Sequence, residues 1–137
     1  MIIRKAINND SEKIKKLVKE TLEEIFNSPA EGLEDLENIN ENFELFLIAE
    51  DDGEIIGTVG LKNEGDARIS RMYVKESKRE AGIGKQLIGK VFNYCNGRFD
   101  RIILTTYPQM KSEQFYNKMG FKKFKQDERI WMEKKLK

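Results

Sequence analysis

Residues 79–87, with the sequence REAGIGKQL, follow an apolar, strand-like segment and precede an amphipathic helix that begins near Gly84. Gly82 and Gly84 have no Cβ, so a ligand can approach the backbone closely. The first turn of a helix has backbone N–H groups without helical partners at the positive end of its dipole. Arg79 and Lys85 add positive charge. The stretch therefore predicts a turn that binds phosphates. The alternative is an ordinary strand–turn–helix junction in which glycine serves only backbone shape.

Length and charge set limits on the class of protein. The 137 residues suit a single domain over residues 1–137, and the net charge is only +1. A balanced charge argues against nucleic acid or an anionic membrane as the main partner. No run approaches the roughly 20 apolar residues of a membrane span, and the N-terminus lacks the apolar core of a signal peptide. We therefore expect neither nucleic acid nor a membrane as the partner, and the cysteine usage described next fits the cytoplasm.

The chain contains no histidine and one cysteine, Cys95. A histidine base, a His-based triad and a His-rich metal site are excluded, and we expect no metal. Cys95 cannot form an internal disulfide, which fits a reducing compartment. It continues the apolar face of a predicted helix, so we interpret it as a core residue and not as a nucleophile. Proton transfer must use Glu, Asp, Tyr, Lys, Cys, a terminus or water.

Hydrophobic periodicity predicts both helices and strands. We expect strands over residues 1–6, 43–50, 54–61, 67–74, 102–106, 121–125 and 129–135, and helices over 11–26, 84–95 and 111–119. Asn9 or Asp10 is expected to cap the first helix, and a short helix or loop is expected over residues 31–42. The strand–helix–strand unit 67–106 forms a right-handed crossover with the glycine turn at the carboxyl end of its first strand. The predicted class is α+β with a mixed sheet.

Two familiar phosphate motifs fail on this turn. The P-loop requires Ser or Thr after Gly-Lys, but Gln86 follows Lys85, and Arg79 stands in place of its first Gly. The dinucleotide fingerprint requires a third Gly where the chain has Leu87. What remains is Arg-x-x-Gly-x-Gly after a strand.

That pattern resembles the acetyl-CoA loop of the GCN5-related N-acetyltransferase (GNAT) superfamily, which is written Gln/Arg-x-x-Gly-x-Gly/Ala. A second motif of the family, Tyr followed by Gly-Phe, is matched by Tyr116, Gly120 and Phe121 in FYNKMGF. The resemblance covers essentially the whole chain. It implies the acyl-CoA N-acyltransferase fold, acetyl-CoA as cosubstrate, and direct acetyl transfer to a small-molecule primary amine in a ternary complex. A protein N-acetyltransferase acting on Lys or N-termini, a CoA-binding module without turnover, and a homodimer remain open.

The resemblance also implies roles for individual residues. The backbones of Met72 and Val74 would pair with pantetheine in a gap that a bulge opens beside their strand. The Val74 N–H would polarise the thioester carbonyl, and Tyr116 would donate a proton to the departing thiolate. The residues expected around the cofactor are Met72, Tyr73, Val74, Arg79, Glu80, Ala81, Gly82, Ile83, Gly84, Lys85, Gln109 and Tyr116.

Several positions depart from the family pattern. Glu80 brings negative charge close to the phosphates, and Arg68 stands where many relatives have a glutamate that serves as general base. The base is therefore unassigned, with water and Glu50, Glu64 and Asp66 as candidates. Acceptor groups are expected from residues 27–42 and the final hairpin, and the acidic stretch 31–41 either attracts a cationic substrate or is a solvated face. Trp131 is interpreted as core or interface.

Overall fold

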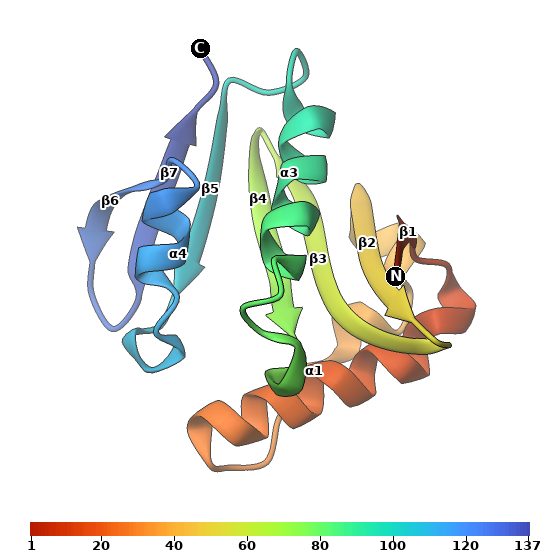
Figure 1. Ribbon diagram of the computed structural model, residues 1–137. Coiled ribbons are helices and arrows are strands. Elements are labelled where there is room, and N and C mark those ends of the chain that lie inside the picture. Colours follow the sequence, from red (N-terminus) through yellow and green to blue (C-terminus); the bar gives the residue numbers. More distant parts are fainter.

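The computed structural model describes residues 1–137 as one seven-stranded sheet with helices on both faces (Figure 1). The strand order is β1-β2-β3-β4-β5-β7-β6, and only β4 and β5 are parallel neighbours. The strands are β1 (Ile2–Lys5), β2 (Leu45–Asp51), β3 (Glu54–Glu64), β4 (Asp66–Val74), β5 (Arg101–Thr106), β6 (Lys122–Gln126) and β7 (Ile130–Lys135). The helices are α1 (Ser11–Phe26), α2 (Ile39–Asn42), α3 (Ile83–Cys95) and α4 (Glu113–Lys118). The predicted mixed α+β class is confirmed.

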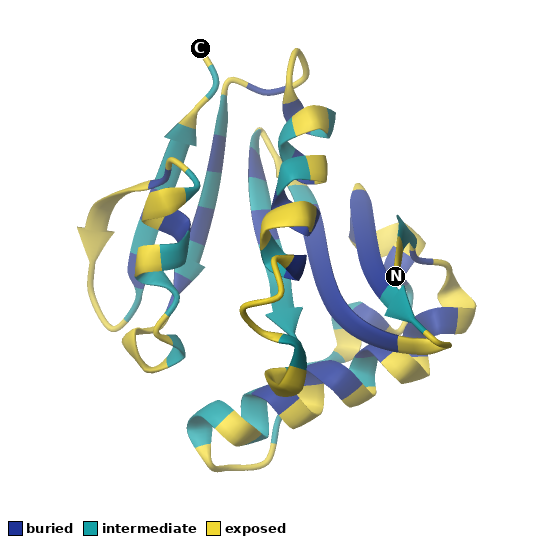
Figure 2. Ribbon diagram, viewed as in Figure 1, coloured by how far each residue is buried: buried dark blue, intermediate teal, exposed yellow.

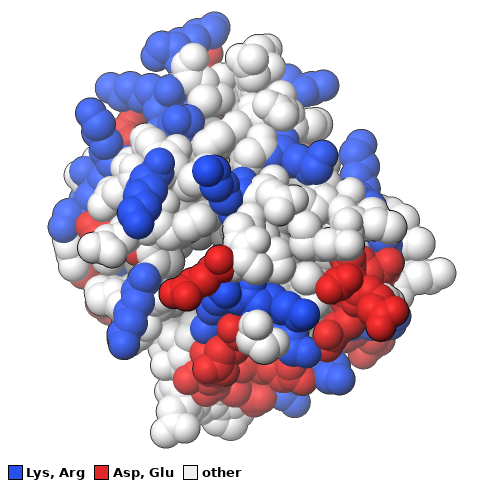
Figure 3. Space-filling model, viewed as in Figure 1, with Lys and Arg blue, Asp and Glu red and all other residues white.

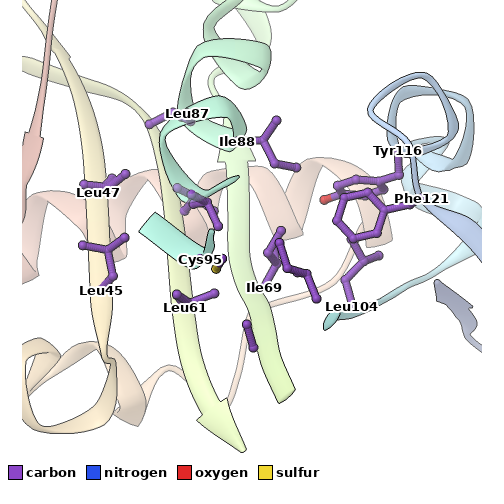
Figure 4. Close-up of a cluster of buried hydrophobic side chains, with 14 of the residues drawn as sticks. Leu45, Leu47, Leu61, Ile69, Leu87, Ile88, Cys95, Leu104, Tyr116 and Phe121 are labelled. Atoms are coloured by element: carbon purple, nitrogen blue, oxygen red, sulfur yellow. The ribbon is translucent and has the colours of Figure 1, made fainter. Parts of the chain in front are cut away.

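Two apolar clusters lie on opposite faces of the sheet. The larger one packs α3 and α4 against the strands and includes Leu87, Ile88 and Tyr116 (Figure 4). The smaller one packs α1 and the segment before β2 against the other face, through residues such as Ile14 and Leu36. Figure 2 shows that β2 and β3, in the middle of the sheet, are buried along most of their length. None of the helices is long and apolar enough to span a bilayer.

The start of α1 differs from the prediction. Asp10 precedes the helix, but neither Asn9 nor Asp10 caps it with a side-chain hydrogen bond. The Asp10 carboxylate instead accepts from the Ile7 N–H at 2.8 Å and from both terminal nitrogens of Arg4 at 2.9 Å. The buried carboxylate therefore ties β1 to the start of α1, and this link over six residues is not visible in a capping pattern.

Three connecting segments precede β2, join β2 to β3 and join β3 to β4, and the third is shorter than predicted. Residues 31–42 contain a 3-10 turn and α2, and Leu36 and Ile39 are buried there. Asp52 and Gly53 join β2 and β3 with φ values of 53° and 79°, as a tight hairpin requires. The turn predicted over residues 62–66 is shorter than expected, because β3 continues to Glu64 and pairs with the start of β4.

A bulge in β4 changes which side chains face each side of the sheet. The pairing of β3 with β4 shifts between Thr58 and Gly60, and Arg71 in the bulge has a φ of +54°. Ala67 and Ile69 face the α3 side before the bulge, whereas Met72 and Val74 face that side after it. The alternate β4 residues therefore face α1.

Charged residues are distributed unevenly over the surface, although they nearly cancel in number. On the face shown in Figure 3, Asp and Glu gather in the lower part and at the right, directly beside Lys and Arg, while the upper left is mostly basic. The long-range field is therefore weak, and local pairs decide the electrostatics of any site.

Candidate active site

The backbones of β4 and β5 separate toward their carboxyl ends (Figure 1), and the region between the separated strands is called the gap below. The two strands pair only at Ala67 with Ile102 and at Arg68 with Ile103, and no pair joins them beyond this point. The Lys75 N–H donates to the Ile56 carbonyl of β3 at 2.8 Å. Because peptide groups alternate along a strand, those of Val74 and Met72 point the other way, into the gap.

The first turn of α3 lies at the mouth of this gap. The backbone N–H groups of Glu80 through Lys85 donate to no protein acceptor, and Gln86 is the first to form a helical hydrogen bond, to the Gly82 carbonyl at 3.1 Å. Gly82 has a φ of +80°, and a Cβ built there would meet nothing within 4 Å. Unused N–H groups around open space at a helix N-terminus form an anion-binding site.

Gly84 marks the inner face of the gap. A Cβ at Gly84 would lie 3.3 Å from Met72 Cε of β4 and 3.3 Å from Phe115 Cζ of α4. These two side chains come from opposite sides of the gap, and both lie close to Gly84. The gap therefore has an apolar wall next to its polar mouth, which suits a ligand with a charged end and a neutral arm.

Tyr116 lies deeper, on the α4 side. Its ring packs edge-to-face with Phe115 and Phe121 at centroid distances of 5.3 and 5.8 Å, and only 6% of the residue is exposed. Its hydroxyl points from α4 toward β4 (Figure 4) and forms no hydrogen bond with another protein group. Burial raises the pKa of Tyr116 well above the ordinary tyrosine value. The phenol is therefore protonated at neutral pH and able to donate.

Arg79 occupies a different position from the one expected of a phosphate ligand. Its guanidinium forms a bidentate pair with the Glu24 carboxylate at 2.9 and 3.0 Å, and its Nε donates to the Val74 carbonyl at 3.0 Å. Arg79 thus ties the end of α1 to the end of β4. Lys85 is exposed and forms no ion pair, so it is the cation left at the turn. Glu80 is exposed beside it.

The structure brings most of the predicted residues together. Met72, Val74, the 79–85 turn and Tyr116 surround the gap, and Gln109 lies exposed in the 3-10 turn Pro108–Met110 that follows β5. Tyr73 is the exception, because its peptide faces β3 and its side chain faces α1. Tyr73, which we expected among the residues around the cofactor, therefore lies with its side chain on the other face of the sheet from Met72 and Val74.

A cavity of about 470 Å³ lies on the α1 side of the sheet. Its walls come from β4, the end of β5 and the loop before α2, and its lining residues are Gly32, Glu34, Asp35, Lys62, Arg68, Ile69, Ser70, Arg71, Tyr73, Thr105, Tyr107 and Met110. The expectation that residues 27–42 supply acceptor groups fits the loop residues in this wall. The sequence singles out Arg68 and Tyr73 of β4 but does not place them in this wall, since the bulge decides which side chains near the end of β4 face α1.

Residues 11–121 match the sequence profile of the acetyltransferase (GNAT) family. The chain belongs to the GNAT family. A probable N-acetyltransferase named camello, from Xenopus tropicalis, is 33% identical in an alignment 84 positions long that covers 57% of this chain and 38% of that protein. This chain therefore spans well under half of that relative's length.

Solved GNAT structures share the fold along the whole chain. An acetyltransferase of the GNAT family from Staphylococcus aureus Mu50 has a TM-score of 0.89 at 24% identity and covers 99% of each chain. The PaiA N-acetyltransferase from Thermoplasma acidophilum, solved in complex with coenzyme A, has a TM-score of 0.85 at 25% identity over 98% of each chain. An aminoglycoside 6'-N-acetyltransferase complexed with coenzyme A has a TM-score of 0.81 at 18% identity, over 100% of this chain and 98% of that one.

The base candidates that we named in this GNAT chain lie outside the cavity wall. Glu50 pairs with Arg4 at 2.9 Å and Asp66 with Arg101 at 2.7 Å. Glu64 lies 3.7 Å from Arg68 but does not line the cavity. Glu34 is the acid in the wall that forms no ion pair. No group of three or more His, Cys, Asp or Glu side chains is placed to hold a metal ion.

Proposed function

We propose that this GNAT protein transfers the acetyl group of acetyl-CoA directly to a primary amine of a small molecule. One observation carries the proposal: the gap between β4 and β5 has the unused N–H groups of α3 at its mouth and the Tyr116 hydroxyl at its side. A cavity lies across β4 from it. A relative of the same fold solved in complex with coenzyme A supports acetyl-CoA as the cosubstrate.

The residues present fit acetyl-CoA. The N–H groups of Ile83, Gly84 and Lys85 and the dipole of α3 would bind the diphosphate. The peptide groups of Met72 and Val74 would pair with the amides of the pantetheine arm, as in an added strand. When bound, acetyl-CoA supplies the acetyl group as a thioester. The apolar side chains of Met72 and Phe115 next to Gly84 would exclude water from the arm.

Two groups of this chain would act on the reacting atoms. The Val74 N–H would donate to the thioester carbonyl oxygen, where negative charge develops as the amine attacks. The Tyr116 hydroxyl would donate to the sulfur as the carbon–sulfur bond breaks. Since its pKa is raised above that of a thiol, about 8.5, the tyrosine stabilises the thiolate by a hydrogen bond more readily than by complete proton transfer. The amine proton would leave through water or Glu34.

A covalent acetyl-enzyme is disfavoured by the state of the only cysteine. Cys95 is fully buried in α3, and burial raises its pKa to about 11. A buried thiol of this kind is neither accessible nor ionised at neutral pH. Cys95 therefore cannot serve as an acetyl-accepting nucleophile, and we propose that the amine attacks the thioester directly in a ternary complex.

Thiol release from acetyl-CoA tests the proposal. The assay should pair the purified protein with small amines and, separately, with peptides that carry Lys or a free N-terminus. We expect amine-dependent release above background hydrolysis with small amines. Release with peptides alone would favour the protein N-acetyltransferase, and tight coenzyme A binding without any release would favour a binding module.

We propose the cytoplasm as the compartment, because a single buried thiol requires no oxidising environment.

We also propose a homodimer. All residues of β6 are exposed at one edge of the sheet, and an open edge can pair with a second copy. Sedimentation equilibrium at micromolar protein concentration tests this, since a monomer of 16.0 kDa is the contrary result.

A further inference from the structure

The charges in the cavity wall are not equally available to a ligand. Arg71 donates to both Asp35 oxygens at 2.8 and 3.0 Å and to the Gly32 carbonyl at 2.7 Å. Arg71 and Asp35 therefore neutralise each other and use their hydrogen-bonding groups. The charged residues left in the wall are Glu34, Lys62 and Arg68, none of which has a close ion-pair partner within hydrogen-bond distance.

Arg68 is half-buried, and its ion pair with Glu64 is long, at 3.7 Å. Its side chain is 24% exposed, and one terminal nitrogen donates to Thr105 Oγ1 at 3.0 Å. Its Nε and its other terminal nitrogen form no hydrogen bond. The Glu64 carboxylate, which is 48% exposed, lies 3.7 Å from that terminal nitrogen, beyond hydrogen-bond distance. A half-buried guanidinium with unused donors matches a carboxylate, which it can bind through two parallel hydrogen bonds.

The surroundings of Arg68 reinforce a preference for anions. Its guanidinium lies 5.8 Å from the Trp131 ring, and the same ring has Lys125 Nζ at 4.8 Å and the Arg129 guanidinium at 4.6 Å. Trp131 pairs with Thr105 across β5 and β7, so this cationic group adjoins the cavity. Asp127 lies 3.9 Å from Lys125 Nζ and 4.0 Å from Arg129 Nε. The final hairpin therefore brings two cations and one carboxylate, a net positive charge, next to the acceptor side.

The position of Arg68 sets the spacing of the ligand. Arg68 lies where β4 and β5 still pair, whereas Ser70 and Met72 lie farther along β4 toward the open gap. At about 3.3 Å per residue, the strand places Arg68 roughly 7 to 13 Å from these residues. An amine held at the gap and an anion held at Arg68 would thus be separated by several bonds.

We propose that the acceptor is a small amine that also carries a carboxylate, and that Arg68 binds this carboxylate while the amine lies toward Ser70 and Glu34. This inference rests on the proposed function and names its substrate class. It also accounts for an arginine at a strand position where a base was expected, because Arg68 then serves specificity and not proton transfer.

Matched acceptors test the proposal. The panel consists of α-amino acids, ω-amino acids of increasing chain length and dipeptides, each paired with its carboxamide. A carboxamide would leave the half-buried Arg68 without a charged partner. We therefore expect each carboxylate to be preferred over its carboxamide by about 30-fold or more in kcat/KM. Arg68→Gln should remove this preference, mainly by raising the KM of the acceptor, and should leave the KM of acetyl-CoA unchanged.

Two variants serve as controls. Arg68→Lys keeps the positive charge but lacks the planar guanidinium that can form two parallel hydrogen bonds, so it should retain part of the preference for carboxylates. Arg129→Gln removes the same charge beside Trp131, outside the cavity wall, and should keep most of it. Thermal unfolding of each variant shows whether the loss of the Thr105 hydrogen bond alters stability.

The inference is overturned if wild type uses carboxylate and carboxamide equally, if Arg68→Gln keeps the preference, or if only protein amines are acetylated. If no amine is acetylated, the proposed function fails, and binding decides the inference separately. Aminocarboxylates should then raise the melting temperature of the coenzyme A-bound wild type but not of Arg68→Gln, and the absence of that difference refutes the role of Arg68.

Discussion

Glu80 is an acidic residue in a left-handed conformation, with a φ of +70°, at the mouth of the anion site. A non-glycine residue there costs about 1 to 2 kcal/mol, and its carboxylate repels a diphosphate. We expect Glu80→Gly to tighten acetyl-CoA binding by about 3- to 10-fold, an effect of the size of an exposed charge contact.

Isothermal titration calorimetry at low and high salt measures this effect. Glu80→Gln is the matched variant, since it removes the charge and keeps the strained backbone. If charge is the cause, both variants bind more tightly at low salt and the gain fades at high salt. Unchanged affinity in both variants would show that the Glu80 carboxylate stays away from the phosphates.

Tyr116 is expected to act on turnover and not on cofactor affinity. Tyr116→Phe keeps the ring contacts with Phe115 and Phe121 and removes only the hydroxyl, so we expect kcat to fall by about 100-fold. Because burial raises its pKa, Tyr116 should stay protonated beyond the ordinary tyrosine value of about 10, and the rate should show no decline from its ionisation below that pH.

Rapid-quench or steady-state kinetics from pH 6 to 10 test this expectation. Tyr94→Phe is the control, since the Tyr94 hydroxyl bonds the exposed Glu44 on the surface. A Tyr116→Phe variant with full activity would remove Tyr116 from the mechanism, and weaker acetyl-CoA binding would assign it to the cofactor instead.

Helix α3 contains two glycines that allow a matched comparison. A Cβ at Gly84 would crowd Met72 and Phe115, whereas a Cβ at Gly89 would meet nothing within 4 Å. Gly84→Val should therefore displace the wall of the gap and weaken acetyl-CoA binding by about 10-fold or more, the cost of overpacking being typically 1 to 3 kcal/mol.

Gly89→Val changes helix propensity in the same way and should keep wild-type affinity. Calorimetric titration with acetyl-CoA, together with thermal unfolding, compares the two variants. Equal loss in both would trace the effect to the helix as a whole, and unchanged binding by Gly84→Val would place the cofactor elsewhere.

The elements show which parts of the site a sequence can reveal. Local periodicity predicts α1, α3 and the parallel strand β5, and the glycine turn predicts the anion site. The family resemblance implies a bulge in β4, but no local signal places it at Arg71, because that residue adopts a conformation that usually requires Gly or Asn. The sequence therefore does not show that Ser70, Arg71 and Tyr73 line the cavity.

Long-range pairs were equally hidden from the sequence. Glu24 lies 55 residues before Arg79, and Asp35 lies 36 residues before Arg71. Each pair requires the tertiary fold before its charges can meet. Resemblance to a family predicts an arginine at position 79, but its ion pair with α1 follows only from the structure.

At the scale of the whole molecule, the sheet consists of two parts that are joined by a short stretch of strand pairing. Strands β1 to β4 form one part, strands β5 to β7 form the other, and β4 pairs with β5 at only two positions. Where the parts separate, β5 no longer pairs with the edge of β4 that contains Met72 and Val74, and the N–H groups of the α3 turn donate to no protein acceptor. A ligand in the gap would supply acceptors and connect both parts.

Hydrogen exchange should detect this connection. Amides without an acceptor exchange fast, so binding of coenzyme A should slow exchange at Met72, Val74 and residues 83–85. At a ligand concentration of 100 times Kd, binding to the native state should also stabilise the fold by about 2.7 kcal/mol. The Ala6 amide, which donates to the Phe46 carbonyl at 2.8 Å near the opposite edge of the sheet, is the internal control. Protection at the α3 turn alone would mean that only the diphosphate is bound, and protection at neither place under saturating ligand would refute the site. Protection at both, with Ala6 unchanged, is the result that a cofactor lying along the whole gap requires.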